Sequence, residues 1–571
     1  MELSEKFFSP SPKKIADKHL LPEETIRLVK DRLSSLGTEI FQELRRVDQG
    51  RLGIPVYMSL YGVEGLRVTG KVKQMGKGAS EELAKASALM ELVERYSLFK
   101  KIQNRPFKKA SLKALGDEAL SLKELLDSVV DPEGDTKAAK TAAKFLPEVP
   151  LYWEKALEVS SGRERLVPIH WFWLLYEYNG SSAGNTLAEA GVQAVCELIE
   201  RHVCALASRQ NLTLPEIDVS RVGEEARRLL GCYERLGVKL YLRDMTLGMP
   251  VPTIAALAYD PSTYPHRSEI VYTAGTATSP ERALIRALTE VAQLAGDFDT
   301  EGRYLESGLP KFETLEEAAP VLAKAGTISL DALPDLSRPD HVEELKLLAE
   351  KLTDQGYALY LCDFTDEELA LPAVYAILPG AHFRERIFLS PLYQLVRVLS
   401  LYLPPEEALV ALKAIEAEAP PRYYLASYLG QILKTLGHHH EAIEMFQKAI
   451  ALSPPPDDLI AIYCHLAHTH LELEQYKAAQ KVAEEALSLH PLPELYNILG
   501  TACFKQGLTA QAFEAYMQAL NLNPQSAQDY ANAGACLASM GFIEEAEEFF
   551  ASAQQLDPSL ELEAYRRLAR R

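Results

Sequence analysis

The chain has 571 residues, and its 60 Lys and Arg against 80 Asp and Glu give a formal net charge of −20. This length exceeds what one hydrophobic core usually supports, so we expect two to four domains. The acidic balance argues against a nucleic-acid partner, because nucleic-acid binders are more often basic. The seven cysteines are scattered and form no CxxC pair, which indicates free thiols rather than a disulfide or zinc framework.

The sequence carries no signal for secretion or for membrane insertion. Its first residues, MELSEKFFSPSPKK, lack the apolar core of a signal peptide. No segment approaches the roughly 20 consecutive apolar residues that a membrane-spanning helix needs. We therefore expect a cytoplasmic protein that does not associate with membranes.

A short glycine-rich segment, GKGAS (76–80), comes directly before the first of the helices described below. The chain has no GxxxxGK[ST] motif, so a standard P-loop is not predicted. The backbone amides of this segment and the ammonium group of Lys77 could instead hold anionic oxygens at the N-terminus of the following helix.

Three stretches place glutamates in helices that are otherwise apolar on nearly every side. In chain order they read SALMELVERYSLF (87–99), NTLAEAGVQAVCELIERHV (185–203) and ERALIRALTEVAQLA (281–295). The glutamates among apolar neighbours are Glu91, Glu94, Glu197, Glu200 and Glu290. An unpaired buried charge costs several kcal/mol, so these carboxylates must be neutralised, hydrogen-bonded or bound to metal. We expect them to carry the function of the protein.

Helical geometry places the acids of each stretch on one face. At about 100° per residue, Glu91 and Glu94 lie roughly 60° apart. Glu189, Glu197 and Glu200 span about 80° over three turns of the second helix. In the third helix Arg286, Glu290 and Gln293 share a face.

If the three helices pack together, six glutamates and one guanidinium group meet in one cleft. So many carboxylates cannot all stay ionised without cations. Oxygen ligands without histidine or cysteine in register favour a hard ion, above all Mg²⁺. Magnesium held by carboxylates most often bridges phosphates, so the pattern predicts a magnesium-dependent nucleotide site.

Two strand-like runs between these helices are similar to each other. The runs 238–244 and 357–363 both end in an aspartate that is followed two residues later by a threonine, Thr246 or Thr365. A proline, Pro252 or Pro372, then opens a second apolar run. This similarity indicates an internal duplication. We expect residues 1–390 to form an α+β domain of repeated strand–strand–helix units, with the strand order left open.

The last third of the chain is a helical repeat. Small residues head equivalent segments at intervals of 37, 33 and 34 residues: Gly430, Ala467, Gly500 and Gly534. A proline closes each unit: Pro454, Pro491, Pro524 and Pro558. This pattern resembles the tetratricopeptide repeat of roughly 34 residues per unit. The first interval is too long for that period, and we place its surplus residues in a loop at 454–458.

The glutamate motifs together resemble the YcaO proteins. GKG-x(8)-SALMELVER, AGNTLAEAGVQAVCELIER and ALIRALTEVAQ occur in that order over roughly residues 20–390. The resemblance implies a catalytic domain that holds ATP through Mg²⁺ and helix-borne glutamates, outside any P-loop. The fold expected is therefore an α+β YcaO-type catalytic domain (1–390), a helical linker (391–420) and an all-α tetratricopeptide-repeat solenoid of about four units (421–571).

The resemblance also assigns roles residue by residue. It assigns Mg²⁺ binding to the six glutamates Glu91, Glu94, Glu189, Glu197, Glu200 and Glu290. Asn185 would complete this cage, Arg201 would contact phosphate oxygens, and Arg286 with Glu290 would contact the nucleotide, as would Glu91. Near the N-terminus, Lys18 and Thr25 match a cation and a hydroxyl residue that bind ATP in the family.

The resemblance leaves alternative functions open. The first is ATP-dependent phosphorylation of a peptide-backbone amide, leading to cyclodehydration or thioamidation of a peptide or protein substrate. The second is an ATP-binding accessory factor for methylthiolation of a ribosomal protein, with the repeats recruiting the partner. The third, a scaffold with a vestigial site, is disfavoured because the acids of all three motifs are intact. Family members are often homodimers, and we expect the same here.

Overall fold

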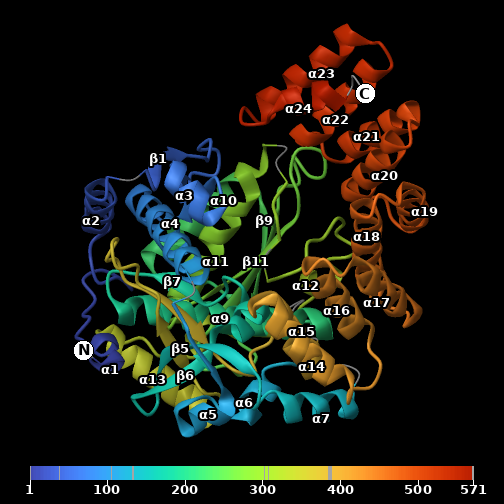
Figure 1. The fold of residues 1–571 in the computed structure, drawn as a ribbon. Helices are drawn as coiled ribbons and strands as arrows, with labels where there is room; N and C mark the ends of the chain where they lie inside the picture. Colours follow the sequence, from blue (N-terminus) through green and yellow to red (C-terminus); the bar gives the residue numbers. More distant parts are fainter. Residues whose placement is uncertain are drawn as a thin grey trace. The chain divides into compact units, whose positions relative to one another are not determined.

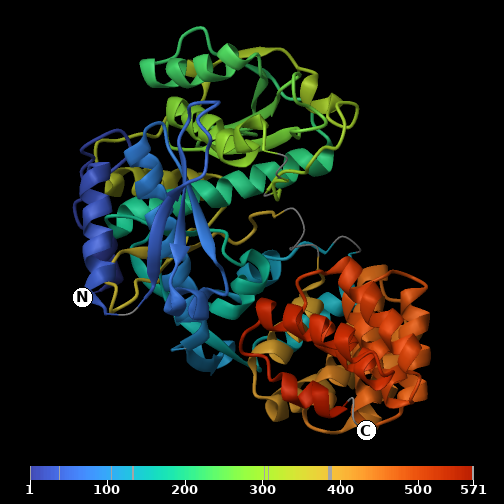
Figure 2. The same ribbon diagram turned by 90° about the horizontal axis from the view of Figure 1, so that it is seen from above.

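The computed structural model describes residues 2–568 except 38, 105, 132–133, 301–302, 307 and 384–388. Contacts within the chain group it into two compact units (Figures 1 and 2). The first unit, residues 1–134 and 146–391, mixes helices and sheets, and the second, residues 135–145 and 392–571, is helical. The predicted fold class, an α+β domain followed by an all-helical region, is confirmed. None of the helices in the described ranges combines the length and apolarity that crossing a bilayer requires.

The strands of the α+β unit form three sheets within the described residues. One sheet has the order β1 (Phe41–Arg46), β2 (Val56–Tyr61), β3 (Lys73–Lys77). The second has the order β11 (Val271–Thr276), β10 (Thr253–Tyr259), β9 (Lys239–Asp244), β8 (Glu216–Asp218), β12 (Thr327–Ser329). The third has the order β4 (Lys108–Ser111), β5 (Pro150–Glu158), β13 (Tyr360–Asp363), β14 (Ala373–Ile377), β7 (Ser181–Ala183), with β6 (Arg163–Pro168) paired to β5.

The helices of this unit include the three that carry the glutamates: α4 (Glu81–Asn104), α9 (Leu187–Gln210) and α11 (Pro280–Ala295). The others are α1 (Leu3–Phe7), α2 (Pro22–Ser35), α3 (Val63–Thr69), α5 (Leu112–Leu115), α6 (Leu122–Asp127), α8 (Ile169–Tyr176), α10 (Glu224–Leu236), α12 (Ala319–Leu322) and α13 (His341–Asp354). The three stretches predicted to be helical around the glutamates are therefore helices (Figure 1).

The predicted duplication is present, and its local structure is the same in both copies. Thr246 and Thr365, at equivalent places after β9 and β13, each accept a hydrogen bond on the side-chain oxygen. The donors are the backbone amides of Thr253 (3.3 Å) and Ala373 (3.2 Å), the first residues of β10 and β14. Each pair of strands is antiparallel.

A third copy, which the sequence analysis missed, begins at β1. Asp48 takes the place of the two threonines, and its Oδ1 accepts a hydrogen bond of 2.9 Å from the amide of Val56, the first residue of β2. In every copy the first residue of the second strand is paired across the sheet with a residue of a third strand: Val56 with Lys77, Thr253 with Thr276, and Ala373 with Ala183. The third strand then leads into a glutamate helix, α4, α11 or α9.

One copy is permuted in the chain. Its third strand and helix, β7 and α9, precede its first two strands, β13 and β14, by well over a hundred residues. The copies β1–β2–β3–α4 and β9–β10–β11–α11 are continuous. All three nevertheless have the same strand pairing, so each presents its helix to its sheet in the same way.

In the two continuous copies, a glycine of the third strand sets how closely the helix approaches that strand. A Cβ added to Gly76 of β3 would lie 2.5 Å from the carbonyl oxygen of Ala84, and one added to Gly275 of β11 would lie 2.6 Å from that of Ala283. The alanines one turn further along, Ala88 and Ala287, are also fully buried. Backbone contact of this kind fixes the rotation and height of the helix over the strand.

The helical unit contains α7 (Thr136–Phe145), α14 (Pro391–Tyr402) and α15 (Pro405–Glu416), followed by pairs of antiparallel repeat helices. The pairs are α16 (Tyr423–Thr435) with α17 (His439–Ala451), α18 (Pro456–Glu472) with α19 (Tyr476–Leu487), α20 (Pro493–Lys505) with α21 (Thr509–Leu522) and α22 (Ala527–Ser539) with α23 (Ile543–Leu556), before α24 (Leu562–Leu568). Consecutive helices of these pairs contact one another (Figure 2).

Size complementarity holds each pair together. Gly430, Gly500 and Gly534 on the first helices face an aromatic ring on the second helix: Phe446, Tyr516 and Phe550. In the remaining pair the equivalent residues are both alanines, Ala467 and Ala483, which are fully buried in one cluster. Three pairs therefore match a glycine with an aromatic ring, and the fourth matches two alanines.

The prediction that the surplus residues form a loop at 454–458 is wrong. Helix α18 begins at Pro456 and has 17 residues, whereas α16, α20 and α22 each have 13. The surplus residues therefore add a turn to the start of α18. Proline favours the first turn of a helix, where its missing N–H removes no intrahelical hydrogen bond.

One helix of this unit comes from the middle of the α+β sequence. Residues 135–145, which contain α7, group with residues 392–571. Ion pairs join Asp135 to Arg422 and Lys144 to Glu418. The linker residues 391–420 are helical, as α14 and α15, and residues 384–388 before them lie outside the described residues.

The tight contact at Gly275 makes a testable prediction. Gly275→Ala should lower the free energy of unfolding by about 2–3 kcal/mol, because the added methyl group meets backbone atoms that cannot move aside. Gly231→Ala in α10 is the matched control. Its Cβ meets nothing within 4 Å, so the better helix former should raise stability by about 0.5–1 kcal/mol. Denaturant unfolding of both variants measures this, and equal stability would contradict the account.

Candidate functional site

The threefold repeat places one glutamate at the same position in each copy. Glu91, Glu290 and Glu197 each lie fourteen residues after the third-strand residue of their copy, Lys77, Thr276 and Ala183. Because the helices pack on their third strands at matching alanines, the same helical position faces the same side in each copy. The three acids singled out by sequence are therefore equivalent in structure.

The glutamates of α4 and α9 influence one another electrostatically. Burial raises the pKa of Glu91 above its ordinary value. Burial, and then the neighbouring charges of Glu197 and Glu91, raise the pKa of Glu94 to about 8 against the opposing effect of Arg95. Burial also raises the pKa of Glu197, and the charge of Glu200 adds to the increase. These carboxylates are thus close enough to disfavour each other's ionised forms.

Two of the copies add a second glutamate and an arginine. The α4 copy has Glu94 and Arg95, the α9 copy has Glu200 and Arg201, and the α11 copy has Gln293 and a leucine instead. The two arginines occupy equivalent positions with different surroundings.

Arg95 has several partners within the protein. Its Nη1 lies 2.9 Å from Glu94 Oε1 and donates hydrogen bonds to Ser181 Oγ (2.9 Å) and to the carbonyl oxygen of Tyr178 (3.2 Å). Its guanidinium carbon also lies 4.5 Å from the centre of the Tyr178 ring. Ser181 Oγ in turn donates to Glu94 Oε1 at 2.7 Å. Arg95 therefore acts as a fixed counter-ion for the carboxylates of α4.

Arg201 is held more loosely. Its terminal nitrogens lie 3.6 Å from Glu200 Oε1 and 3.8 Å from Glu197 Oε1, which are long ion-pair distances. Its Nε is buried, and no described residue accepts a hydrogen bond from it. An unsatisfied buried donor is costly. Arg201 therefore keeps a buried donor that a bound anion could satisfy, whereas Arg95 already donates two hydrogen bonds from its Nη1.

Lys77 of β3 and Arg286 of α11 lie in the same part of the site. The ammonium group of Lys77 forms an ion pair with Glu290. Burial, and then the charge of Arg286, lower the pKa of Lys77 to about 8, against the effect of Glu91 and Glu200. Nη1 of Arg286 donates a hydrogen bond to Oε1 of Gln193 on α9. Groups from α4, α9 and α11 therefore share one electrostatic environment.

The remaining predicted residues meet at the start of α9. Thr25 Oγ1 donates a hydrogen bond of 3.0 Å to Asn185 Oδ1, and Asn185 Nδ2 donates one of 3.2 Å to Glu189 Oε2. The ammonium group of Lys18 lies 3.8 Å from Glu189 Oε1. Glu189 is 5% exposed. The structure thus brings Lys18, Thr25, Asn185 and Glu189 together, although they come from distant parts of the sequence.

Asp17 connects this group to α11. Burial alone would raise its pKa, but the charges of Lys18, Arg282 and Arg286 lower it to about 2. The N-terminal segment and the third glutamate helix therefore lie within electrostatic reach of each other.

The fit of these residues to Mg²⁺ and phosphate depends on the balance of acids and cations. Among the described residues, no three His, Cys, Asp or Glu side chains form a ready-made metal cage. The carboxylates instead face Arg95, Arg201 and Lys77. Magnesium that bridges phosphates needs only one or two carboxylates, the other ligands being water and phosphate oxygen. Acids with raised pKa values and the unsatisfied Nε of Arg201 fit such an ion–phosphate pair, and the six-glutamate cage stays a prediction.

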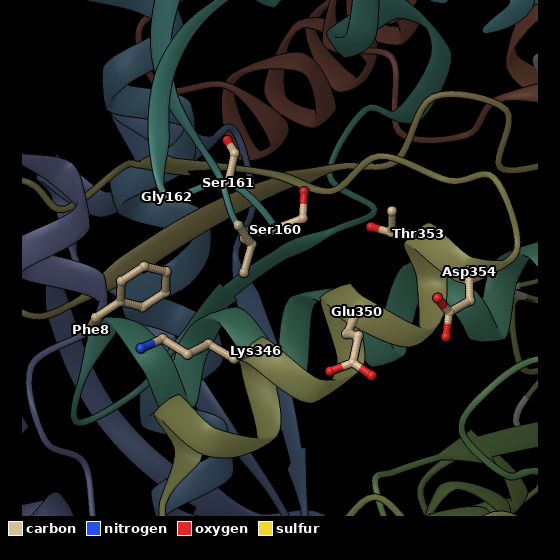
Figure 3. Close-up of a pocket in the computed structure, with 9 residues that line it drawn as sticks. Phe8, Ser160, Ser161, Gly162, Lys346, Glu350, Thr353 and Asp354 are labelled. Atoms are coloured by element: carbon tan, nitrogen blue, oxygen red, sulfur yellow. The ribbon is translucent and has the colours of Figure 1, made fainter.

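A separate hollow of about 520 Å³ lies elsewhere on the α+β unit (Figure 3). Phe8, the β5–β6 turn at residues 159–162 and the C-terminal half of α13 line it. The ammonium group of Lys346 lies 4.4 Å from the centre of the Phe8 ring. None of the predicted site residues lines this hollow, so it is distinct from the glutamate cluster.

Three residues of the cluster were not assigned a role from sequence: Asp17, Ser181 and Gln193. Asp17 stands next to Lys18, and Gln193 lies on the face of α9 that carries Glu189 and Glu197. Their positions in the sequence could therefore have indicated that they belong to the site. Ser181 lies on a short strand whose pairing with β14 is not visible in the sequence.

Comparison with known proteins identifies both parts of the chain. Residues 75–382 match the family model described as "YcaO cyclodehydratase, ATP-ad Mg2+-binding". Residues 429–456, 460–491 and 493–526 match the tetratricopeptide repeat, so the resemblance of the helical repeats is confirmed.

Relatives align with most of the α+β unit. An uncharacterized protein of Methanothermobacter thermautotrophicus is 28% identical over 384 residues, which cover 63% of this chain and 93% of that protein. The ribosomal protein S12 methylthiotransferase accessory factor YcaO of Escherichia coli is 26% identical over 346 residues, covering 53% of this chain and 56% of that one. A heterocyclase solved with substrate and cofactor has a TM-score of 0.56 at 24% identity, covering 73% of this chain and 59% of that one.

The different surroundings of Arg201 and Arg95 predict that replacing each arginine with alanine will have a different effect. Arg201→Ala should weaken MgATP binding by roughly 10–100-fold, because charge-assisted hydrogen bonds to phosphate are lost. Arg95→Ala should instead cost about 1–3 kcal/mol of unfolding free energy in the nucleotide-free protein, because buried acceptors of its hydrogen bonds, among them Ser181 Oγ and the carbonyl oxygen of Tyr178, lose their donor. Calorimetric titration and denaturant unfolding of both variants separate the roles. Unchanged MgATP affinity in Arg201→Ala, in a folded variant, would remove the assignment of Arg201 to phosphate.

Proposed function

The chain belongs to the YcaO family, whose cofactors are ATP and Mg²⁺, and on that premise we propose that it phosphorylates a backbone amide of a peptide or protein. The observation that carries the proposal is the set of equivalent glutamates on α4, α9 and α11 beside Arg201, whose buried Nε has no acceptor in the described protein. Such a site suits a nucleotide triphosphate with its magnesium.

In this proposal the acids bind the metal and the cations bind the phosphates. Glu91, Glu94, Glu197 and Glu200 hold magnesium, with Glu189 and Glu290 at the edges of the set. Arg201, Arg286 and Lys77 neutralise phosphate oxygens. Lys18, Thr25 and Asn185 complete the nucleotide contacts at the start of α9.

Held by these residues, MgATP would supply the phosphoryl group that converts an amide oxygen into a leaving group for attack on the amide carbon. Phosphoryl transfer depends mainly on positioning and on charge neutralisation. The chain's residues provide both without a protein nucleophile. The sequence offers no Ser–His or Cys–His arrangement at these motifs, in keeping with this chemistry.

A second candidate is an accessory role in methylthiolation. Its support is the similarity to the Escherichia coli accessory factor for ribosomal protein S12 methylthiotransferase. In this role the site would bind MgATP, and the tetratricopeptide repeats would recruit the modifying enzyme or its substrate. Both candidates need the same nucleotide site, so they differ in turnover rather than in binding.

MgATP titration of the full chain tests the shared site. Glu91→Ala and Glu200→Ala should each reduce MgATP affinity by at least about 100-fold, because each removes a carboxylate from the metal set. Glu82→Ala, at the start of α4, is the matched control and should bind as the wild type does. Wild-type affinity in both site variants would exclude the proposed nucleotide site.

Phosphate release distinguishes the two candidates. A modifying enzyme should release phosphate from ATP when its peptide substrate is added, whereas an accessory factor should bind MgATP and release none with every candidate peptide. A wild-type protein that binds MgATP but releases no phosphate with any candidate peptide would therefore favour the accessory role.

We further propose that the repeat helices capture a peptide or protein, since stacked repeats of this kind present extended binding surfaces. A homodimer and a cytoplasmic location stay part of this proposal, and so do the domain limits 1–390, 391–420 and 421–571. The proposal excludes nucleic-acid and membrane partners.

Truncation tests this division of labour. Removing residues 392–571 would leave α7 without the helices it groups with, so residues 135–145 should be replaced by a Gly–Ser linker in the same variant. MgATP affinity should then stay within about twofold of the wild type, because all the proposed nucleotide-binding residues belong to the first unit, while capture of the peptide or protein substrate is lost. A large loss of nucleotide affinity, in a folded truncation, would make the repeats part of the nucleotide site.

A further inference from the structure

Gln193 is the one neutral member of the row that α9 presents to the site. Glu189 lies four residues before it and Glu197 four residues after it, so the three share one face of the helix. The repeat places Gln193 and Arg286 at the same position of their copies, each four residues before the equivalent glutamate, Glu197 or Glu290. These two equivalent side chains are hydrogen-bonded to each other, Arg286 Nη1 donating to Gln193 Oε1.

Arg286 differs from the other cations of the site in its partner. Lys77 pairs with Glu290, Arg95 with Glu94, Arg201 with Glu197 and Glu200, and Lys18 with Glu189. Arg282, one turn before Arg286 on α11, pairs with Glu225 at 2.8 Å. Within the described residues, no carboxylate forms an ion pair with Arg286. Its hydrogen-bond acceptor there is the neutral amide of Gln193.

The charge of Arg286 therefore reaches into the site without a direct counter-ion. It lowers the pKa of Asp17 and opposes the protonation of Lys77. A guanidinium group has five N–H donors, and the bond to Gln193 uses one of them. The remaining donors, and the full positive charge, are free of carboxylate acceptors.

We infer that Gln193 is a positioning residue that orients Arg286 toward the phosphates of MgATP while leaving its charge unneutralised. The inference deepens the proposed function and rests on it. An amide oxygen accepts the hydrogen bond that fixes the guanidinium plane, and, unlike a carboxylate, it adds no negative charge. A glutamate here would pair with Arg286 and would extend the acidic row from Glu189 to Glu200, opposite to what a triphosphate needs.

Two substitutions of similar size separate orientation from charge. Gln193→Met keeps the length of the side chain and removes the acceptor, so Arg286 loses its anchor. MgATP affinity should fall about 3–10-fold, the usual cost of one hydrogen bond. Gln193→Glu keeps an acceptor and adds a charge, and affinity should fall further, by at least about 10-fold. Arg286→Ala should itself weaken binding by at least about 10-fold.

A double-mutant cycle on the full chain shows whether Gln193 acts through Arg286. Titration with MgATP should give the same affinity for Arg286→Ala and for Arg286→Ala combined with Gln193→Met, because the anchor has no function once the guanidinium group is gone. Thermal unfolding of the nucleotide-free variants, with midpoints close to the wild type, establishes that each is folded. A purely structural role of Gln193 would weaken binding equally in both backgrounds.

The possible failures are distinguishable. A wild type that does not bind MgATP removes the proposed function and the inference with it. Weak binding by Arg286→Ala together with wild-type binding by Gln193→Met overturns the inference alone and leaves the nucleotide site standing. Equal or tighter binding by Gln193→Glu overturns the argument from charge.

Discussion

The backbone contact between each third strand and its helix is the constraint on which the site depends. Gly76 and Gly275 lie so close to the helix backbone that a single Cβ would overlap it. The alanines opposite them are fully buried. Such contact allows one height and one rotation of the helix over the sheet, and so it determines where a glutamate two turns later will face. In the α9 copy Ser182 stands in place of the glycine, and the equivalent alanines, Ala190 and Ala194, are fully buried as well. The three copies thus carry their glutamates at equivalent positions.

The copies share this backbone arrangement but differ in the side chains around the glutamates, and these differences give the site its mixture of acids and cations. Equivalent positions carry Arg95 and Arg201, but the first is bound by a carboxylate, a hydroxyl, a carbonyl and an aromatic ring, while the second keeps a buried donor without an acceptor in the described protein. Equivalent positions also carry Gln193 and Arg286, which bond to each other. The equivalent positions therefore differ in charge and in partners, and the proposed division between acids for metal and cations for phosphate depends on this difference.

The ionised forms of the buried glutamates are the least stable part of the arrangement. Burial and mutual repulsion raise the pKa values of Glu91, Glu94 and Glu197, so the protein alone disfavours their ionised forms. Arg95 offsets part of this cost from a fixed position. A divalent cation would offset the rest, which makes the binding of magnesium and the ionisation of the acids one coupled event. The helical unit depends on different physics, the matching of glycine with aromatic rings and of alanine with alanine.

The sequence by itself determined the elements. Apolar flanks around Glu91, Glu197 and Glu290 were enough to predict helices and a site, because buried carboxylates are rare without a function. The spacing of Gly430, Ala467, Gly500 and Gly534 determined the repeat, because close packing of helix pairs needs small residues at a fixed period. The family resemblance, the α+β class and the cofactors were readable at this level, whereas the surplus residues before Ala467 were misplaced, since a proline-rich segment also suits the first turn of a helix.

Only the tertiary structure decided how these elements combine. The third copy of the repeat was hidden because β7 and α9 are separated in the chain from β13 and β14, and strand pairing ignores chain order. The placing of α7 with the repeat helices was hidden for the same reason. The different surroundings of Arg95 and Arg201 come from neighbours such as Tyr178 and Ser181, and the partner of Arg286 is a residue on another helix. Contacts between distant segments depend on packing, which local sequence patterns do not encode.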